Sequence, residues 1–223
     1  RNGKNYLIKP GETDEFDWTS RIPFEEMPHS YNPENGMVSS ANNKTVGNDY
    51  PYYIGTYFSQ DYRINRIREM LEEKEKLSVE DFKNMLADQN SMLARAFVPD
   101  MLAELKDVDG DDNFNKALEL LTNWDGIMDV DEVAPLLFEK TYHNMIAALI
   151  KDDLGDDLFA EYYNNSALSR NFIDDFWKTK DAKWCDDIST VDLVESFGDQ
   201  VRTSFKETLT QLELELGSDM DNW

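Results

Sequence analysis

Two adjacent asparagines, Asn42 and Asn43, follow a short apolar segment and precede Lys44. Residues 37–41 are predicted to form a β-strand, which would place the pair at a strand end. Asparagine is common there as a turn residue, because it tolerates the left-handed backbone conformation. An amide fixed on a rigid strand can instead donate its N–H groups to an oxyanion that develops in a transition state. The spacing alone leaves both interpretations open.

Few other side chains suit nucleophilic or acid–base chemistry. His29 lies in a predicted turn and is expected to be a surface residue. His143 lies in a predicted helix among apolar neighbours and is expected to be a packed or capping residue. Cys185 is the one cysteine, so it forms no internal disulfide or cysteine-rich zinc site and is predicted to be a buried or partly exposed free thiol. No phosphate-binding loop and no His-Glu-x-x-His motif occurs. The sequence therefore contains no complete active site that can be recognised from spacing.

The chain is strongly acidic, with 223 residues, 22 Lys and Arg, 46 Asp and Glu, and a formal charge of −24. This charge excludes nucleic-acid binding by phosphate neutralisation and argues against a polybasic membrane-binding module. Hydrophobic residues make up 40% and aromatic residues 12%, which indicates a folded chain. No apolar stretch is long enough to predict a membrane span. Arg63 and Arg66, one helical turn apart, are predicted to form surface ion pairs.

The acidic segment 107–112 resembles a calcium loop only in composition. An EF-hand needs Gly at position six and Glu at position twelve, whereas here Gly110 is fourth and Leu118 twelfth. The segment 125–131 fails in the same way. Both are predicted to be acidic turns and helix caps, with a weak calcium site as the alternative.

The spacing of apolar residues predicts a mainly helical fold after residue 56. Ser78 and Thr190 are predicted N-caps, and Pro99 is expected to kink or break its helix. We expect six to eight helices, covering 57–71, 79–86, 93–105, 114–124, 133–149, 156–178 and 190–216.

Residues 1–55 differ, because prolines, glycines and Asn-Pro or Asn-Gly turns interrupt them throughout. Only short strands fit between these turns: residues 37–41 and, more weakly, 5–8. The fold class is therefore mainly α with a short, loop-rich, β-type N-terminal arm. We expect two parts, an arm over 1–55 that completes a sheet supplied by something else, and a helical subdomain over 56–223.

Five short motifs follow one another in the N-terminal part of the chain: Ile22-Pro23-Phe24-Glu25-Glu26-Met27-Pro28, Tyr31-Asn32-Pro33-x-x-Gly36, Ala41-Asn42-Asn43-Lys44, Asp49-Tyr50-Pro51 and Tyr62-Arg63-x-x-Arg66-Ile67. In order and spacing they resemble the β chain of the penicillin acylase (penicillin amidase) family. Two later motifs are also similar: Leu77-Ser78-x-Glu80-Asp81 and Leu120-Leu121-x-x-Trp124-Asp125-Gly126. The resemblance is strong over about 16–135 and faint afterwards.

The resemblance implies an N-terminal-nucleophile hydrolase, of which this chain would be the helical portion of an α+β fold. In that family the N-terminal serine of the β chain attacks an acyl amide, such as the side chain of a β-lactam or an acyl-homoserine lactone. It uses its own α-amino group as the base, since a serine hydroxyl is otherwise a poor nucleophile. The implied partners are a small-molecule acyl amide substrate and the remainder of the parent α and β chains. The implied location is periplasmic or secreted.

Two residues match functional positions of the family. Asn42 matches the asparagine of the oxyanion hole, and Arg63 matches an arginine close to the active site. These are the candidate catalytic residues that the resemblance implies. No cofactor and no metal ligand in this chain is expected. A structural calcium ion in the intact parent remains possible, but Tyr53-Ile54-Gly55 stands near the position of the acidic ligand that some members use.

The chain also differs from the family pattern, because residue 1 is Arg1 and no residue matches the nucleophilic serine. We therefore expect an internal fragment of an acylase β chain that is inactive alone. One alternative is a stand-alone acidic helical module that mediates interactions or binds calcium weakly. Another is a non-catalytic homologue whose full-length form also lacks the serine.

Overall fold

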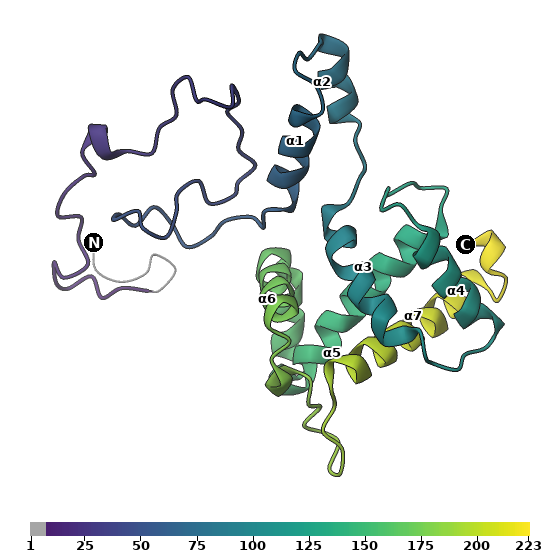
Figure 1. The fold of residues 1–223 in the computed structure, drawn as a ribbon. Helices are drawn as coiled ribbons and strands as arrows, with labels where there is room; N and C mark the ends of the chain where they lie inside the picture. The colour runs from purple at the N-terminus through teal and green to yellow at the C-terminus, as the bar shows by residue number, and fades with distance from the viewer. Residues whose placement is uncertain (1–7) are drawn as a thin grey trace. The chain divides into compact units, whose positions relative to one another are not determined.

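The computed structural model describes residues 8–223, apart from the side chains of Ser166 and Ala167 (Figure 1). The chain divides into two compact units, and the boundary in the sequence falls between Leu77 and Ser78. Seven α-helices occur in the described residues, and their β-structure is limited to one isolated antiparallel bridge between Asn90 and Ile127. The predicted mainly helical fold is thus confirmed.

The first unit contains little regular structure. In its described part, one short 3-10 helix, η1 (Phe24–Glu26), and one α-helix, α1 (Tyr62–Glu72), are joined by turns and loops. Among residues 8–77, the buried residues are few: Ala41, Asn43, Ile64 and Met70. Large aromatic side chains are exposed instead, with Tyr31 at 92%.

The strand predicted over residues 37–41 is wrong, because this segment has no regular secondary structure. Side-chain oxygens accept hydrogen bonds from backbone N–H groups that a strand would use to pair with a neighbouring strand. The Met37 N–H donates to Asn35 Oδ1, and the Ala41 N–H donates to Asn43 Oδ1. The weaker strand predicted over 5–8 lies almost entirely outside the described residues.

Helix α1 begins later than the apolar pattern predicted, at Tyr62 rather than Tyr57. The Ser59 N–H donates to the Asn42 carbonyl oxygen at 2.8 Å, so the backbone before the helix is used to hold the preceding loop. The helix then buries Ile64 and Met70 on one face, as amphipathic spacing requires.

The second unit is built from six α-helices: α2 (Val79–Leu86), α3 (Met92–Leu105), α4 (Asp112–Asn123), α5 (Val133–Asn164), α6 (Ser166–Thr179) and α7 (Phe197–Leu216). Two 3-10 helices accompany them, η2 (Ala182–Trp184) and η3 (Met220–Asn222). Helix α5 packs against α4, α6 and α7, and α3 packs against α4 and α7 (Figure 1). The fully buried core side chains include Phe97, Leu137, Phe138, Met145, Ile146, Leu149 and Phe205.

Pro99 does not end its helix, although a break was one of the expected outcomes. Helix α3 continues through it, and Phe97, Val98 and Met101 around it are buried. Proline contributes no N–H to the helical ladder. Burial of these neighbouring side chains compensates for that loss.

The segments predicted over 133–149 and 156–178 are divided differently in the structure. Helix α5 extends to Asn164 but reverses at Gly155, whose φ of 70° and ψ of 166° are not helical. The returning part brings Tyr163 Oη to 2.9 Å from His143 Nδ1. Glycine suits this turn, because a Cβ is disfavoured at such a φ. Helix α6 then begins separately after Asn165.

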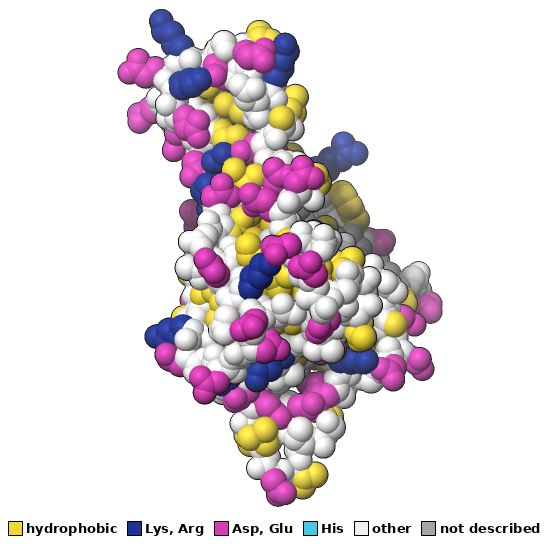
Figure 2. Space-filling model, turned by 90° about the vertical axis from the view of Figure 1, so that its right-hand side faces the viewer, with side chains coloured by type: hydrophobic (Ala, Val, Ile, Leu, Met, Phe, Trp, Pro, Cys, Tyr) yellow, Lys and Arg dark blue, Asp and Glu magenta, His cyan; other side chains and the backbone are white. Residues whose placement is uncertain are grey.

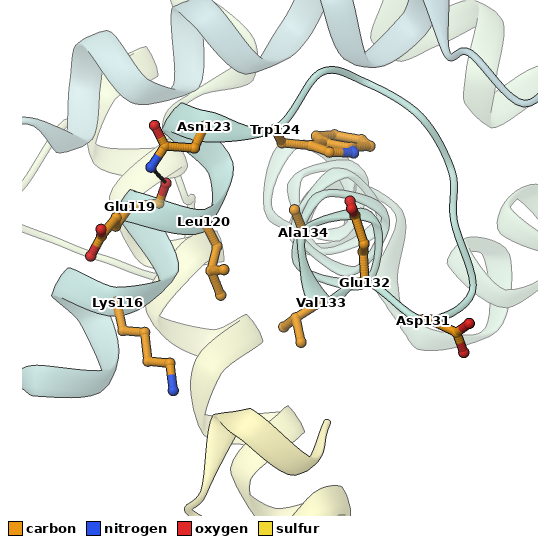
Figure 3. A pocket seen from close by; sticks show the side chains of 9 residues that line it. All are labelled: Lys116, Glu119, Leu120, Asn123, Trp124, Asp131, Glu132, Val133 and Ala134. Carbon is orange, nitrogen blue, oxygen red and sulfur yellow. Dashed lines mark hydrogen bonds between the residues drawn. The ribbon is translucent and has the colours of Figure 1, made fainter.

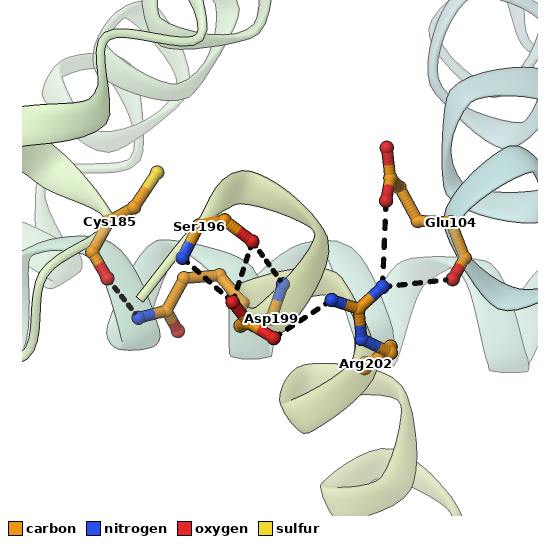
Figure 4. Close-up of polar contacts among 6 residues, drawn as sticks. Glu104, Cys185, Ser196, Asp199 and Arg202 are labelled. Atoms are coloured by element: carbon orange, nitrogen blue, oxygen red, sulfur yellow. Dashed lines mark hydrogen bonds and ion pairs between the residues drawn. The ribbon is translucent and has the colours of Figure 1, made fainter. Parts of the chain in front are cut away.

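Helix α7 begins at Phe197, and Ser196 rather than Thr190 is its N-cap. Ser196 and Asp199 form a capping box, in which each side chain accepts the backbone N–H of the other. Arg202 links the start of α7 to α3 (Figure 4). Its Nη2 lies 2.8 Å from Asp199 Oδ1, and its Nη1 lies 3.6 Å from Glu104 Oε2 in α3. The Thr190 hydroxyl instead donates to the Asp187 carbonyl oxygen in the preceding loop.

On the face that Figure 2 shows, the carboxylates are scattered rather than gathered in one patch. Several serve as helix caps or as partners of Lys and Arg, including Asp81, Asp111 and Asp199. Among the described residues, no helix is both long enough and apolar enough to cross a bilayer.

We expect Phe205→Ala to lower the free energy of unfolding by about 3–5 kcal/mol, because the ring is fully buried and leaves a cavity. Leu214→Ala is the matched control on the same helix, since Leu214 is 83% exposed. Its effect should stay within about 0.5 kcal/mol. Urea unfolding followed by circular dichroism measures both. Equal effects would contradict the orientation of α7.

The carboxyl group of Asp199 should make the stability of the folded protein depend on pH in the acidic range. Hydrogen bonds from Ser196, then from Arg202, lower the pKa of Asp199 to about 2. A carboxyl group whose folded pKa is depressed contributes stability above its unfolded pKa, and this contribution is lost as pH falls toward the folded pKa. Asp199→Asn should therefore make the melting temperature less dependent on pH between about 4 and 2. The exposed Asp192→Asn is the control, and an identical pH profile for both variants would contradict the prediction.

Candidate functional site

Asn42, the candidate oxyanion donor, lies in a tight loop rather than at a strand end. Its backbone is left-handed, with a φ of 62°, as the turn interpretation of the Asn-Asn pair predicted. Its side chain is exposed, whereas its neighbours Ala41 and Asn43 are buried. Asparagine is one of the few residues that adopt this conformation readily. The left-handed residue reverses the chain locally and presents the Asn42 side chain on the outside of the bend.

The structure brings Arg63, the second candidate, directly to Asn42. Arg63 Nη2 donates to Asn42 Oδ1 at 2.8 Å and to the Ala41 carbonyl oxygen at 2.8 Å. Both residues belong to the first unit, with Arg63 in the first turn of α1. The predicted ion-pair role does not describe these contacts, since Arg63 donates to two neutral oxygens. Arg66, by contrast, does form the predicted surface pair, with Glu69 Oε2 at 2.6 Å.

The contact with Arg63 determines which way the Asn42 amide faces. A guanidinium only donates, so it must meet the amide oxygen and not the amide nitrogen. Asn42 Nδ2 is therefore directed away from Arg63, and none of residues 8–223 accepts a hydrogen bond from it. The result is an oriented, exposed N–H donor beside a positive charge. Chemically, this arrangement suits an anionic oxygen of a ligand or a transition state.

The two histidines lie apart from this loop in sequence and in their contacts. His29 is exposed, with Nδ1 2.9 Å from the Met27 carbonyl oxygen. His143 packs between the two parts of α5, against Tyr163, and its Nε2 lies 3.6 Å from Glu139 Oε2. Burial lowers the pKa of His143 despite the carboxylate of Glu139. Both match the structural roles predicted for them.

The acidic segments form turns and caps in the second unit. Asp111 Oδ1 accepts the Phe114 N–H at 2.8 Å and caps α4, and Asp125 Oδ1 accepts the Ile127 N–H at 2.9 Å. These contacts agree with the predicted roles of segments 107–112 and 125–131. Within residues 8–223, His, Cys, Asp and Glu side chains form no group of three with the geometry of a metal site.

An open pocket of about 550 Å³ lies in the second unit between α4 and the start of α5. Leu120 and Val133 face each other across it, and the Trp124 ring lies at one side (Figure 3). Trp124 is fixed by a hydrogen bond from Nε1 to the Ile127 carbonyl oxygen at 2.8 Å. Neither Asn42 nor Arg63 lines this pocket.

Comparison with known proteins places the chain in a family. The model of the penicillin amidase family matches residues 1–223, so the chain belongs to that family. The family match extends over the C-terminal part as well, where the motifs alone gave only a faint resemblance.

Individual relatives agree with this assignment. The chain is 33% identical over 132 residues to penicillin acylase 2 proenzyme of Pseudomonas sp. (strain SE83), covering 58% of this chain and 16% of the relative. It is 30% identical over 126 residues to penicillin G acylase of Escherichia coli, covering 54% and 14%. The matched part of the chain thus covers only 16% and 14% of the length of these relatives.

The fold also resembles a solved structure. Thermostable penicillin G acylase from Alcaligenes faecalis superposes with a TM-score of 0.69 over 93% of this chain and 41% of that chain, at 19% sequence identity. At this identity the likeness concerns the fold alone. It shows that the helical arrangement is one that a penicillin acylase contains.

We expect the Cys185 thiol to be unreactive in the folded protein. Its side chain is buried, and burial, followed by the charges of Asp181 and Asp199, raises its pKa to about 11. At about pH 8 this leaves roughly 100-fold less thiolate than a free cysteine has. Reaction with a disulfide reagent such as DTNB should be correspondingly slow and should become fast in guanidinium chloride. Fast labelling of the native protein would contradict this burial.

Proposed function

We propose that this chain is part of an enzyme that hydrolyses acyl amides through an N-terminal serine, and that Asn42 supplies one donor of its oxyanion hole. The main observation behind this proposal is the hydrogen bond from Arg63 to Asn42 Oδ1, which leaves Asn42 Nδ2 directed away from Arg63. Family membership supports the reaction class. The substrates are side-chain amides such as those of β-lactams or acyl-homoserine lactones, which follow from the resemblance of the motifs.

In the proposed reaction, the serine oxygen attacks the amide carbonyl carbon and its proton passes to a base. The carbonyl oxygen becomes an oxyanion in the tetrahedral intermediate. Asn42 Nδ2 donates a hydrogen bond to this oxygen, most strongly when the negative charge is complete. The base then gives the proton to the leaving nitrogen as the C–N bond breaks, and the amine departs. Water attacks the acyl-enzyme, which releases the acid and regenerates the serine hydroxyl. No residue of 1–223 matches the serine, so we propose that another part of the enzyme supplies it.

Arg63 has two effects in this proposal. Its hydrogen bond to Asn42 Oδ1 polarises the amide, which makes Nδ2 a better donor. Its positive charge beside the loop also favours negative charge on the substrate oxygen. Because Arg63 contacts Asn42 and makes no contact with the reacting atoms, it is a positioning residue, and its replacement should lower kcat less than loss of Asn42 does.

The exposed aromatic side chains of the first unit favour a partner polypeptide for this chain. Among residues 8–77 few side chains are buried, while Trp18, Phe24 and Tyr31 are each more than three-quarters exposed. Aromatic side chains of this size contribute to stability mainly when they are covered. We propose that the remaining polypeptide of the α and β chains covers them. Export to the periplasm or beyond belongs to the same proposal.

Asn42→Ala in the full-length enzyme should lower kcat about 100-fold or more, because one oxyanion donor is lost. KM should change little, since the hydrogen bond forms mainly in the transition state. Steady-state hydrolysis of a phenylacetyl or acyl-homoserine-lactone amide measures both constants. Residues 1–223 alone should show no turnover.

Asn115→Ala is the matched control, because Asn115 is an exposed asparagine of the second unit whose Nδ2 donates to the Gly110 carbonyl oxygen. It should leave kcat unchanged. An unchanged kcat in Asn42→Ala would remove Asn42 from the site. Turnover by residues 1–223 alone would contradict the assignment of the nucleophile to another part of the enzyme.

A further inference from the structure

The second asparagine of the pair, Asn43, has a different environment from the first. Its side chain is buried, with 7% exposed, in a unit whose described part buries few residues. Asn43 Oδ1 accepts the Ala41 N–H at 3.1 Å, and Asn43 Nδ2 donates to the Lys44 carbonyl oxygen at 3.1 Å. One amide side chain thus bonds to the backbone on both sides of Asn42.

This bracing constrains the backbone of Asn42. For the Asn43 side chain to reach back to the Ala41 N–H, the chain must fold tightly over the residue between them. That residue is Asn42, whose φ of 62° is unusual for a residue with a Cβ. Without the brace, the commoner right-handed and extended conformations become more accessible to Asn42. Its side chain would then leave the direction in which Arg63 holds it.

Two further hydrogen bonds hold the same bend from the side of α1. The Ser59 N–H donates to the Asn42 carbonyl oxygen at 2.8 Å, and Arg63 Nη2 donates to the Ala41 carbonyl oxygen at 2.8 Å. Neither contact involves the Ala41 N–H, whose buried hydrogen bond has Asn43 Oδ1 as its acceptor among the described residues. Loss of Asn43 would therefore leave a buried N–H group without its acceptor.

We propose that Asn43 is a positioning residue for the oxyanion donor: its buried amide holds Asn42 in the left-handed conformation from which Asn42 Nδ2 is presented. The inference rests on the proposed function and deepens it. Asn43 touches no substrate atom in this account. The two asparagines thus have different roles, one donating to the reacting oxygen and the other fixing the backbone of the donor.

A double-mutant cycle in the full-length enzyme tests this role. Asn43→Ala should lower kcat about 10-fold or more with KM within about 3-fold, because a misplaced donor affects mainly the transition state. In the Asn42→Ala background the same change should lower kcat no further, since the donor that it positions is already absent. A crystal structure of Asn43→Ala should show residue 42 without its positive φ.

Asn48→Ala is the matched control in the same loop, because Asn48 Oδ1 accepts from Lys44 Nζ at 2.7 Å and contacts none of the backbone around Asn42. It should leave kcat unchanged. Melting temperatures show whether each variant folds. If Asn43→Ala does not fold, Asn43→Leu replaces it in the cycle, because leucine keeps a similar side-chain shape and removes both hydrogen bonds of the amide.

The outcomes separate the two proposals. If Asn42→Ala lowers kcat but the change at residue 43 does not, the positioning role is overturned and the oxyanion role stands. If the losses are additive, Asn43 acts independently of Asn42 and the inference is wrong. If Asn42→Ala itself leaves kcat unchanged, the proposed function fails, and the role of Asn43 fails with it.

Discussion

The hydrogen bonds of a single guanidinium nitrogen join helix α1 to the loop that carries the candidate site. Arg63 Nη2 donates to the Ala41 carbonyl oxygen and to Asn42 Oδ1, each at 2.8 Å. Two oxygens of neighbouring residues can share this donor only if the chain bends sharply at Asn42. The left-handed backbone of Asn42 and the buried amide of Asn43 meet that requirement. Each of these contacts therefore acts on the same bend of the chain.

The two units are stabilised in different ways. The second has an apolar core in which α5 and α7 bury residues such as Phe138 and Phe205, with helix ends closed by capping boxes. The first has few buried residues among those described, and local hydrogen bonds define its loop. A loop held by so few contacts is well defined only if its surroundings exclude alternatives. This agrees with the proposal that further polypeptide covers the first unit.

Local sequence patterns predicted most of the helices. The Ser78 capping box and the apolar stripe of α4 are each encoded within a few residues, so the start of α2 and the buried face of α4 were predicted correctly. Other boundaries depended on distant contacts. Thr190 has the residue type of an N-cap, yet its hydroxyl is used within a loop, and the helix starts at Ser196. The strand over 37–41 was wrong because side chains, not a neighbouring strand, take its backbone groups.

The sequence by itself determined the helical class of the second unit, the acidic surface and, through the order of its motifs, the family that the comparisons show. It also singled out Asn42 and Arg63, but it could not show that they touch. They lie 21 residues apart, and a contact over that distance depends on how the chain between them folds. Only the tertiary structure decided that Arg63 meets the amide oxygen of Asn42 and directs its N–H groups outward. The physical reason is that hydrogen-bond direction depends on atomic positions in space, which residue type and spacing do not specify.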